Sequence, residues 1–232
     1  MPLRWLSNLR LPGQNGRWRL GLDGDGCIAR LQPLPAGTAA AGEDWQGDWL
    51  SPAAVDLQIN GGLGLAFPEL QEGDLPTLLA LLERLWQDGV EAISPTIVTC
   101  ACADLRRALM VLAEARRQHR PGRCRLLGAH LEGPFLEPSR RGAHPAQHLA
   151  APSLEALHER IEGFEDAIAL VTLAPELPGA AALIEALVAR GIVVSLGHSA
   201  ASEADAEAAY TQGVRMVTHA FNAMPDMHRR AP

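Results

Sequence analysis

Short apolar runs alternate with longer stretches of helical pattern along most of the chain, from residue 51 onward. The runs have the length of buried strands, and the stretches between them are rich in Ala, Leu, Glu and Arg. Strands separated by helices predict a parallel sheet built from βα units. The predicted strands cover residues 54–59, 92–98, 125–131, 168–173, 192–196 and 215–218, and the predicted helices lie near 74–88, 103–119, 153–162, 179–190 and 202–212.

Residue types at the helix ends support these boundaries. Asp74 and Ser202 suit helix N-caps, and Gly89, Gly191 and Gly213 lie where helix C-termini are expected. Six strands in about 180 residues fit either a doubly wound sheet or most of a (β/α)8 barrel. The first predicted strand is not followed by a G-x-G-x-x-G motif, which counts against a dinucleotide-binding fold.

The first 50 residues have a different pattern. They contain four of the five tryptophans, a Gly-rich turn at 23–26 and a short alternating run at 17–20. Alternation between turn residues is typical of short strands. We therefore expect a small β-rich unit over residues 1–50 and an α/β domain over residues 51–232.

Composition excludes several classes of function. The chain has 20 basic and 27 acidic residues, a net charge of −7, and 47% hydrophobic residues. This composition excludes global disorder, and a general nucleic-acid binder would need a basic face. All 20 basic residues are Arg, and the absence of Lys excludes a Walker-type phosphate lysine, a Schiff-base lysine and a lysine-derived metal bridge.

The location of the protein follows from features that the sequence lacks. The four cysteines are scattered and form no C-x-x-C pair, which is typical of reduced thiols. No N-terminal segment has the pattern of a signal peptide, and no apolar stretch reaches the roughly 18 residues of a membrane span. We expect a soluble cytoplasmic protein without a membrane partner.

Four of the predicted strands end in polar clusters, at residues 56–62, 130–135, 197–199 and 218–224. In a parallel α/β barrel the carboxyl ends of the strands share one face, where active sites are built. Glu132, His198 and His219 would therefore converge although they are far apart in sequence. One carboxylate and two imidazoles form a suitable ligand set for a catalytic divalent metal.

These clusters resemble the N-acetylglucosamine-6-phosphate deacetylase family of the amidohydrolase superfamily. The similarity runs from the first predicted strand of the α/β domain to the last residue, with the motifs in the family's order. It implies a (β/α)8 metal-dependent hydrolase barrel, of which about six of the eight units are present, and part of a small β-sandwich at the N-terminus. The matching motifs are DLQING at 56–61, HLEGPF at 130–135, LGHS at 196–199 and THAFNAMP at 218–225.

The resemblance implies that Glu132, His198 and His219 bind one divalent metal, commonly zinc, with Fe²⁺ or another divalent ion as alternatives. Many amidohydrolases carry His-x-His on the first strand, where this chain has Gln58 and Asn60. That replacement indicates the single-metal form of the site. The absence of Lys agrees, since two-metal relatives often bridge their metals with a carboxylated lysine.

The same resemblance implies hydrolysis of the acetamide of N-acetylglucosamine 6-phosphate to glucosamine 6-phosphate and acetate, a step of amino-sugar catabolism. His144 would polarise the acetyl carbonyl, with Ala143 beside it at the substrate. Asn222 and the backbone of Ala223 would hold the sugar phosphate. Arg230 would reach the phosphate across the interface of a homodimer.

The family's general base, an aspartate at the end of the last barrel strand, is expected to lie beyond the last residue of this sequence. We therefore expect a truncated or incompletely recorded form of a longer enzyme, one that binds metal weakly and turns over poorly. Asp56 on the first strand is a poor substitute because nothing supports its geometry. His130 points to the same face as Glu132 and is expected to support the ligands from behind.

Two other functions remain open. A related amidohydrolase would act on another N-acyl substrate or on a cyclic amide. A non-catalytic sugar-phosphate binder would keep the pocket and lack the chemistry. The expected phosphate contacts at Asn222 and Ala223 favour the sugar phosphate over the first alternative, and the intact set of Glu132, His198 and His219 argues against the second.

Overall fold

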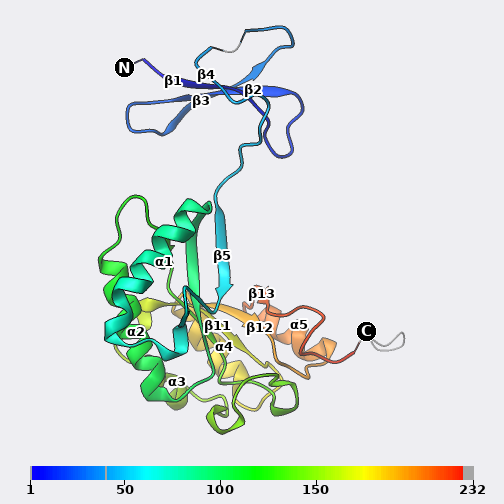
Figure 1. The fold of residues 1–232 in the computed structure, drawn as a ribbon. Helices are drawn as coiled ribbons and strands as arrows, with labels where there is room; N and C mark the ends of the chain where they lie inside the picture. The colour runs from blue at the N-terminus through cyan, green and yellow to red at the C-terminus, as the bar shows by residue number, and fades with distance from the viewer. Residues whose placement is uncertain (1, 40, 227–232) are drawn as a thin grey trace. The chain divides into compact units, whose positions relative to one another are not determined.

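The computed structural model describes residues 2–39 and 41–226 of the 232-residue chain. The chain divides into two compact units, residues 1–53 and 54–232 (Figure 1). Each unit has its own sheet and its own apolar core.

The first unit contains one four-stranded sheet in the order β3-β2-β1-β4. Strands β1, β2 and β3 pair antiparallel in sequence, and β4 pairs parallel with β1. Three buried leucines on β1 and β2 (Leu6, Leu9 and Leu20) form its small core. The strands are β1 (Arg4–Leu9), β2 (Arg17–Leu22), β3 (Ile28–Leu34) and β4 (Glu43–Asp44). A single sheet is described here, and its place in a β-sandwich stays a prediction.

The second unit is built on a curled parallel sheet in the order β13-β12-β11-β10-β8-β5, as the alternating pattern predicted. The short strand β9 pairs with β8 beside this path. A parallel sheet brings the carboxyl ends of all its strands to one edge. Its strands are β5 (Ala54–Ile59), β8 (Val90–Val98), β9 (Arg125–Leu126), β10 (Ala129–Glu132), β11 (Ile168–Leu173), β12 (Val193–Leu196) and β13 (Met216–Val217).

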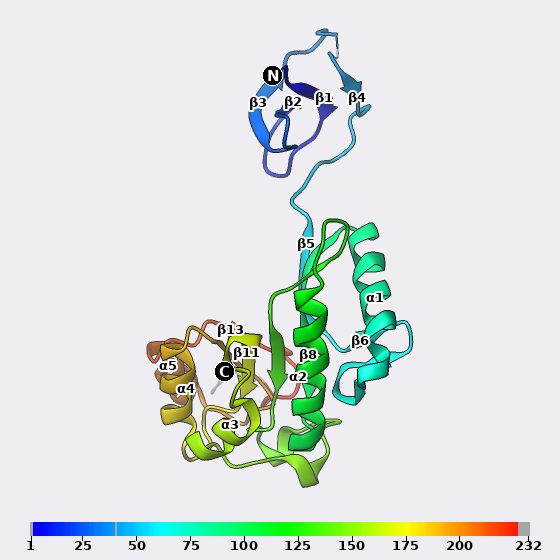
Figure 2. The same cartoon turned by 90° about the vertical axis from the view of Figure 1, so that its left-hand side faces the viewer.

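Five helices connect these strands and lie along the outer side of the sheet (Figure 2). They bury Leu, Ile, Val and Ala side chains against the strands in one continuous core. No helix among the described residues is both long and apolar enough to cross a membrane. The helices are α1 (Leu75–Gln87), α2 (Cys102–Arg117), α3 (Leu154–Ile161), α4 (Ala180–Ala189) and α5 (Glu203–Thr211). Shorter elements are the hairpin β6 (Gly61–Gly62) and β7 (Leu65–Ala66) and the 3-10 turns η1 (Phe67–Glu69), η2 (Glu72–Asp74), η3 (Pro138–Arg140), η4 (Ala146–His148) and η5 (Glu165–Ala167).

The helix ends follow the predicted signals with one difference. Ser202 caps α5 by accepting a hydrogen bond from the backbone N–H of Asp205. Asp74 stands at the N-cap position of α1, but its carboxylate instead accepts from the backbone N–H of Gln71, one turn earlier. The three predicted glycines, Gly89, Gly191 and Gly213, each come directly after a helix C-cap and have φ angles of 85°, 74° and 112°.

The prediction of one strand over residues 125–131 was wrong. The segment forms two strands, β9 and β10, separated by Leu127 and Gly128. Gly128 has a φ of 142°, and a Cβ there would lie 2.9 Å from the backbone nitrogen of Ala169. A side chain at this position would therefore collide with the neighbouring strand, and only glycine lets the chain bend so close to it. The bend leaves Glu132 as the last residue of β10.

Core packing under α3 gives a stability prediction with a matched control. Leu157 on α3 is 3% exposed and belongs to the main core, whereas Leu154 on the same helix is 53% exposed. Leu157→Ala should lower the free energy of unfolding by about 2–5 kcal/mol, because it leaves a cavity in packed surroundings. Leu154→Ala should change it by less than about 1 kcal/mol. Denaturant unfolding of both variants checks this, and equal losses would contradict the described packing.

Candidate metal centre and substrate site

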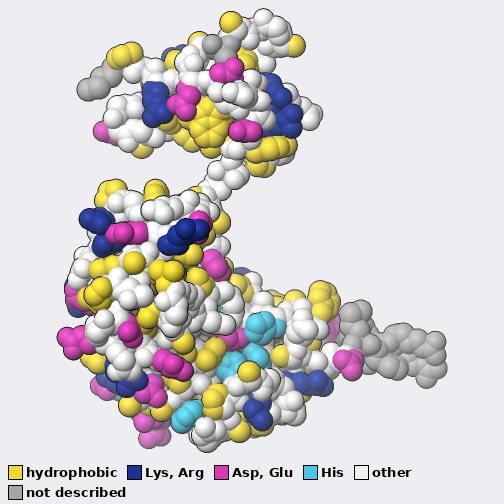
Figure 3. Space-filling model, viewed as in Figure 1, with side chains coloured by type: hydrophobic (Ala, Val, Ile, Leu, Met, Phe, Trp, Pro, Cys, Tyr) yellow, Lys and Arg dark blue, Asp and Glu magenta, His cyan; other side chains and the backbone are white. Residues whose placement is uncertain are grey.

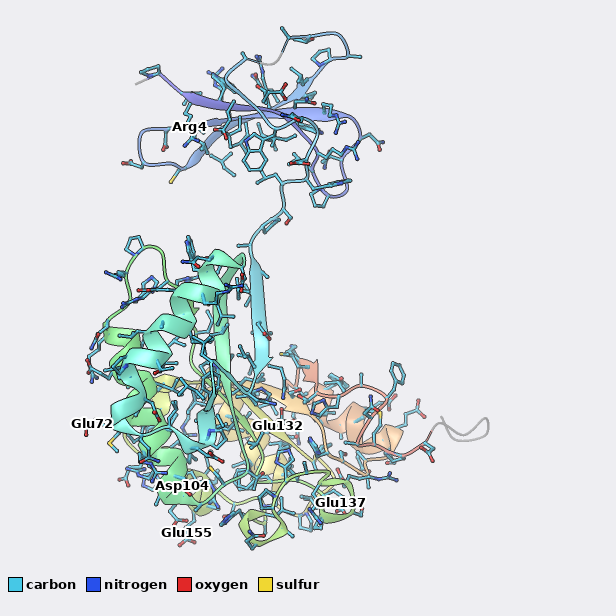
Figure 4. The ribbon with its side chains drawn as sticks, in the orientation of Figure 1. Arg4, Glu72, Asp104, Glu132, Glu137 and Glu155 are labelled. Carbon is cyan, nitrogen blue, oxygen red and sulfur yellow. The ribbon has the colours of Figure 1, made fainter. Side chains whose placement is uncertain are left out.

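Glu132 lies at the carboxyl end of β10, near the middle of the second unit (Figure 4). Its side chain is almost fully buried, in contrast to the peripheral Glu72, Asp104 and Glu155 that are labelled in the same view. A buried carboxylate is costly unless charged or polar partners compensate for its desolvation. Glu132 therefore needs partners, and the ends of the neighbouring strands supply them.

His198 and His219 turn toward Glu132 from the ends of β12 and β13. Nε2 of His198 lies 3.1 Å and Nε2 of His219 lies 2.7 Å from the same oxygen, Oε1 of Glu132. Both histidines have left-handed backbone angles, with φ of 51° and 55°, a conformation that is uncommon for residues other than glycine. Histidine side chains gather on the face of the second unit shown in Figure 3.

These three side chains fit a divalent metal ion. Each offers one ligand atom, and the three atoms lie within 4.8 Å of one another. Neighbouring donors around a tetrahedral zinc ion lie about 3.3 Å apart, given metal–ligand bonds of about 2.0–2.2 Å. Imidazole and carboxylate are also the donor types that such ions take in catalytic sites.

Bonds on the far side of Glu132 and His198 fix the orientation of these two side chains. Nδ1–H of His198 donates to the backbone carbonyl of Arg140 at 2.9 Å, which leaves Nε2 facing Glu132. The side-chain amide of Gln58 donates to Oε2 of Glu132 at 2.9 Å, which leaves Oε1 facing the two histidines. Metal-binding histidines and carboxylates usually have such outer partners. Gln58 thus holds Glu132 in place from β5, while the exposed Asn60 lies just after that strand.

The electrostatics of the cluster favour an ionised carboxylate. Burial, the largest single influence, pushes the pKa of Glu132 upward. Hydrogen bonds from His198 and Gln58 and the nearby charges of His144 and His219 together outweigh it and lower the pKa to about 2. Burial disfavours the charged form of His198, yet its hydrogen bond to Glu132 raises its pKa above the ordinary value. Negative charge therefore concentrates on the oxygen that both imidazoles face, as a cation site requires.

His144 lies in the loop after η3 and reaches the same centre. Its Nε2 is 4.0 Å from Oε1 of Glu132, and its ring packs edge-on against that of His198 with centroids 4.5 Å apart. Thr99 contacts the other ring nitrogen, Nδ1, with both its backbone N–H and its hydroxyl. Burial lowers the pKa of His144 to about 4, so its imidazole is neutral at pH 7.

The residues expected at the substrate lie at the surface beside this cluster. Asn222 is exposed, and its backbone N–H donates to the carbonyl of His219 at 2.7 Å. The carbonyl of Ala223 accepts from the backbone N–H of Ser199 at 3.1 Å, which ties this loop to the one that carries His198. Ala143 is exposed next to His144. Arg230 lies outside the described residues.

Beneath the cluster, His130 belongs to a buried network of hydrogen bonds that crosses the sheet. Its Nδ1–H donates to the carbonyl of Leu57 at 3.2 Å, and its Nε2 lies 2.7 Å from the hydroxyl of Thr172. The hydroxyl of Thr218 lies 2.8 Å from that of Thr172 and 2.8 Å from that of Ser195. This network of hydrogen bonds links β5, β10, β11 and β12 to the end of β13, the strand that precedes His219.

Sequence reasoning missed Thr99 and the carbonyl of Arg140. Thr99 follows β8 directly, so a search for hydroxyl as well as charged residues at strand ends would have found it. The role of Arg140 depends on a backbone atom in a loop, which no residue pattern reveals. Asp56 uses its carboxylate locally, accepting from the backbone N–H of Gln58 at 3.0 Å.

Comparison with known proteins gives clear relatives, although no family model matches the chain. The N-acetylglucosamine-6-phosphate deacetylase of Caenorhabditis elegans is 39% identical over 199 residues, which are 82% of this chain and 46% of the relative. The N-acetylgalactosamine-6-phosphate deacetylase of Escherichia coli O157:H7 is 32% identical over 209 residues, which are 90% of this chain and 53% of the relative. The chain thus spans about half the length of the curated relatives it matches.

A solved structure shows the same fold. The N-acetyl-D-glucosamine-6-phosphate deacetylase of Mycobacterium smegmatis, a mutant in complex with N-acetyl-D-glucosamine-6-phosphate, aligns with all of this chain and 59% of its own length. The TM-score is 0.82 at 27% sequence identity. This match confirms the partial (β/α)8 barrel over the doubly wound alternative. The chain is a homologue of the N-acetylglucosamine-6-phosphate deacetylases of the amidohydrolase superfamily.

Proposed function

We propose that this chain carries the metal and substrate site of a cytoplasmic deacetylase. Its reaction is hydrolysis of the acetamide of N-acetylglucosamine 6-phosphate to glucosamine 6-phosphate and acetate, in amino-sugar catabolism. One observation carries the proposal, the convergence of Glu132, His198 and His219 at the carboxyl edge of the sheet. The sequence relatives support the substrate class, because their names specify acetylated amino-sugar phosphates.

Glu132, His198 and His219 would hold one divalent ion, with zinc as the proposed metal. Such an ion supplies Lewis acidity, which activates water at neutral pH and polarises the amide carbonyl. Residues of this chain orient the side chains that would bind the ion. Gln58 and the carbonyl of Arg140 hold the carboxylate and one imidazole so that their free ligand atoms face each other.

His144 would act on the substrate. Neutral and buried, it presents Nε2 beside the metal-binding oxygen of Glu132. As the amide carbonyl becomes tetrahedral, its oxygen gains negative charge, and a donor placed there in advance stabilises that charge. Moving the water's proton to the departing amine needs a general base. None of the described residues is assigned that role, and the expected aspartate stays a prediction.

The phosphate would bind at the loop after β13. The side chain of Asn222 and the backbone N–H of Ala223 would donate to its oxygens, and the bond from Ser199 to Ala223 fixes this loop beside the metal-binding residues. Arg230 of a second subunit would add a charge in a homodimer.

Asn222→Ala should raise KM for the sugar phosphate by about 10–100-fold with kcat little changed, because it removes a hydrogen bond to a charged group worth about 1.5–3 kcal/mol. Steady-state acetate release measures both constants. The matched control is Gln212→Ala, an exposed amide at the end of α5. A fall in kcat at unchanged KM would contradict the assignment of Asn222 to the phosphate.

Substrate identity is tested by comparing acetate release from three compounds. These are N-acetylglucosamine 6-phosphate, unphosphorylated N-acetylglucosamine and N-acetylgalactosamine 6-phosphate. The proposal predicts turnover of N-acetylglucosamine 6-phosphate, weak turnover of unphosphorylated N-acetylglucosamine, and inhibition by free phosphate. The relative from Escherichia coli O157:H7 makes N-acetylgalactosamine 6-phosphate the second candidate. Preference for the galacto epimer would establish that candidate. A chain that neither binds any of the three compounds nor releases acetate from them would contradict the proposed function.

A further inference from the structure

Thr99 contacts His144 through two different groups. It follows β8 directly and is 4% exposed. Its backbone N–H donates to Nδ1 of His144 at 3.3 Å, and its hydroxyl oxygen lies 2.9 Å from the same nitrogen. The hydroxyl also lies 3.2 Å from the backbone carbonyl of Glu132, so Thr99 connects the loop that carries His144 to the end of β10.

The chain leaves room for this hydroxyl. Gly133, directly after Glu132, has a φ of 88°, and a Cβ there would lie 2.2 Å from Oγ1 of Thr99. Any other residue at this position would displace the hydroxyl that meets His144. The contact between Thr99 and His144 therefore depends on a glycine that stands beside the metal cluster.

Donor and acceptor chemistry sets the tautomer of His144. A backbone N–H can only donate, so the Nδ1 that it meets must be an acceptor. A neutral imidazole whose Nδ1 accepts carries its proton on Nε2. That nitrogen faces Glu132 Oε1 at 4.0 Å.

His198 is held as the opposite tautomer. Its Nδ1 faces a carbonyl oxygen, which can only accept, so its proton belongs on Nδ1 and its Nε2 offers a lone pair when neutral. The two imidazoles, whose ring centroids lie 4.5 Å apart, thus carry their protons on different ring nitrogens. His198 is set as a ligand, and His144 is set as a hydrogen-bond donor.

We infer that Thr99 is a positioning residue that holds His144 as the Nε2–H tautomer, so that His144 donates to the substrate's acetyl oxygen and is not a fourth metal ligand. The inference rests on the proposed function for the identity of the acceptor. The tautomer itself follows from the backbone N–H of Thr99, which donates to Nδ1. The single proton of the Thr99 hydroxyl is then directed at Nδ1 of His144, the nearer of its two neighbours, and not at the carbonyl of Glu132.

Nitrogen NMR of the imidazole rings tests the tautomer without any need for activity. In the wild-type protein with zinc added, His144 should show an unprotonated Nδ1 and a protonated Nε2, and neither nitrogen should show a metal contact. A proton on Nδ1, or zinc bound at Nε2, would overturn the inference. His144→Gln assigns the signals. This readout does not depend on acetate release, so a failure of the proposed function and a failure of this inference are distinguishable.

Two substitutions test the positioning role. Thr99→Val keeps the shape and the backbone N–H but removes the hydroxyl, and it should lower kcat about tenfold, a typical effect for loss of an outer partner of a functional histidine. KM and zinc affinity should stay unchanged, because the phosphate loop and the three metal-binding atoms are untouched. Thr99→Ser restores the hydroxyl and should restore kcat. Unchanged kcat in Thr99→Val, or equal loss in both variants, would overturn the role of the hydroxyl.

Discussion

Glu132→Gln is expected to weaken zinc binding strongly and to abolish acetate release. The substitution keeps the shape of the side chain but removes the only carboxylate of the cluster, and the two histidines then face a neutral amide. Loss of one partner of a buried charged group costs about 3–5 kcal/mol, which corresponds to a roughly 100- to 4,000-fold weaker affinity for the ion. Zinc titration by calorimetry, followed by an acetate assay at saturating zinc, measures the two effects separately.

Glu155→Gln is the matched control, because Glu155 is exposed in the first turn of α3 (Figure 4). It should bind zinc as the wild type does. If Glu132→Gln binds zinc with unchanged affinity, the ion is held elsewhere and the assignment of the cluster is wrong. Circular dichroism of both variants shows whether any loss comes from unfolding.

His144→Asn should lower kcat by about 10²–10³-fold, the usual cost of removing one preorganised donor from a developing oxyanion. Zinc binding should stay intact, because His144 lies next to the three ligand atoms and is not one of them. The kinetic measurement is kcat for N-acetylglucosamine 6-phosphate, with zinc content determined on the same samples.

The matched control is His148→Asn, which changes the other histidine of the same loop, at the end of η4. It should leave kcat and zinc content unchanged. Loss of zinc in His144→Asn would show that His144 is a ligand, and an unchanged kcat would show that it does not act on the carbonyl.

The central geometry was predictable because a parallel sheet obeys a simple rule. Strands with helices between them place their carboxyl ends at one edge, so Glu132, His198 and His219 meet although 87 residues separate the first from the last. Residue type then indicated the chemistry. The sequence pattern was sufficient here because each side chain lies on a strand end or one to two residues past it.

Other parts of the site depend on backbone conformation, which the pattern does not report. The left-handed angles of His198 and His219 turn their rings inward, and no sequence rule predicts them for histidine. The split of 125–131 into two strands depends on how closely Gly128 approaches the neighbouring strand. The tautomer of His144 depends on the direction of one N–H at Thr99. These features follow from tertiary packing and became visible only in three dimensions.

Zinc-edge anomalous diffraction from crystals of this protein grown with N-acetylglucosamine 6-phosphate tests the central claim most directly. We predict one zinc peak, about 2.0–2.2 Å from a Glu132 oxygen and from Nε2 of both His198 and His219. The acetyl oxygen should lie within hydrogen-bond distance of Nε2 of His144, and the phosphate should lie against Asn222 and Ala223. No peak at these three residues, or a zinc ion held by other side chains, would contradict the assignment of this site.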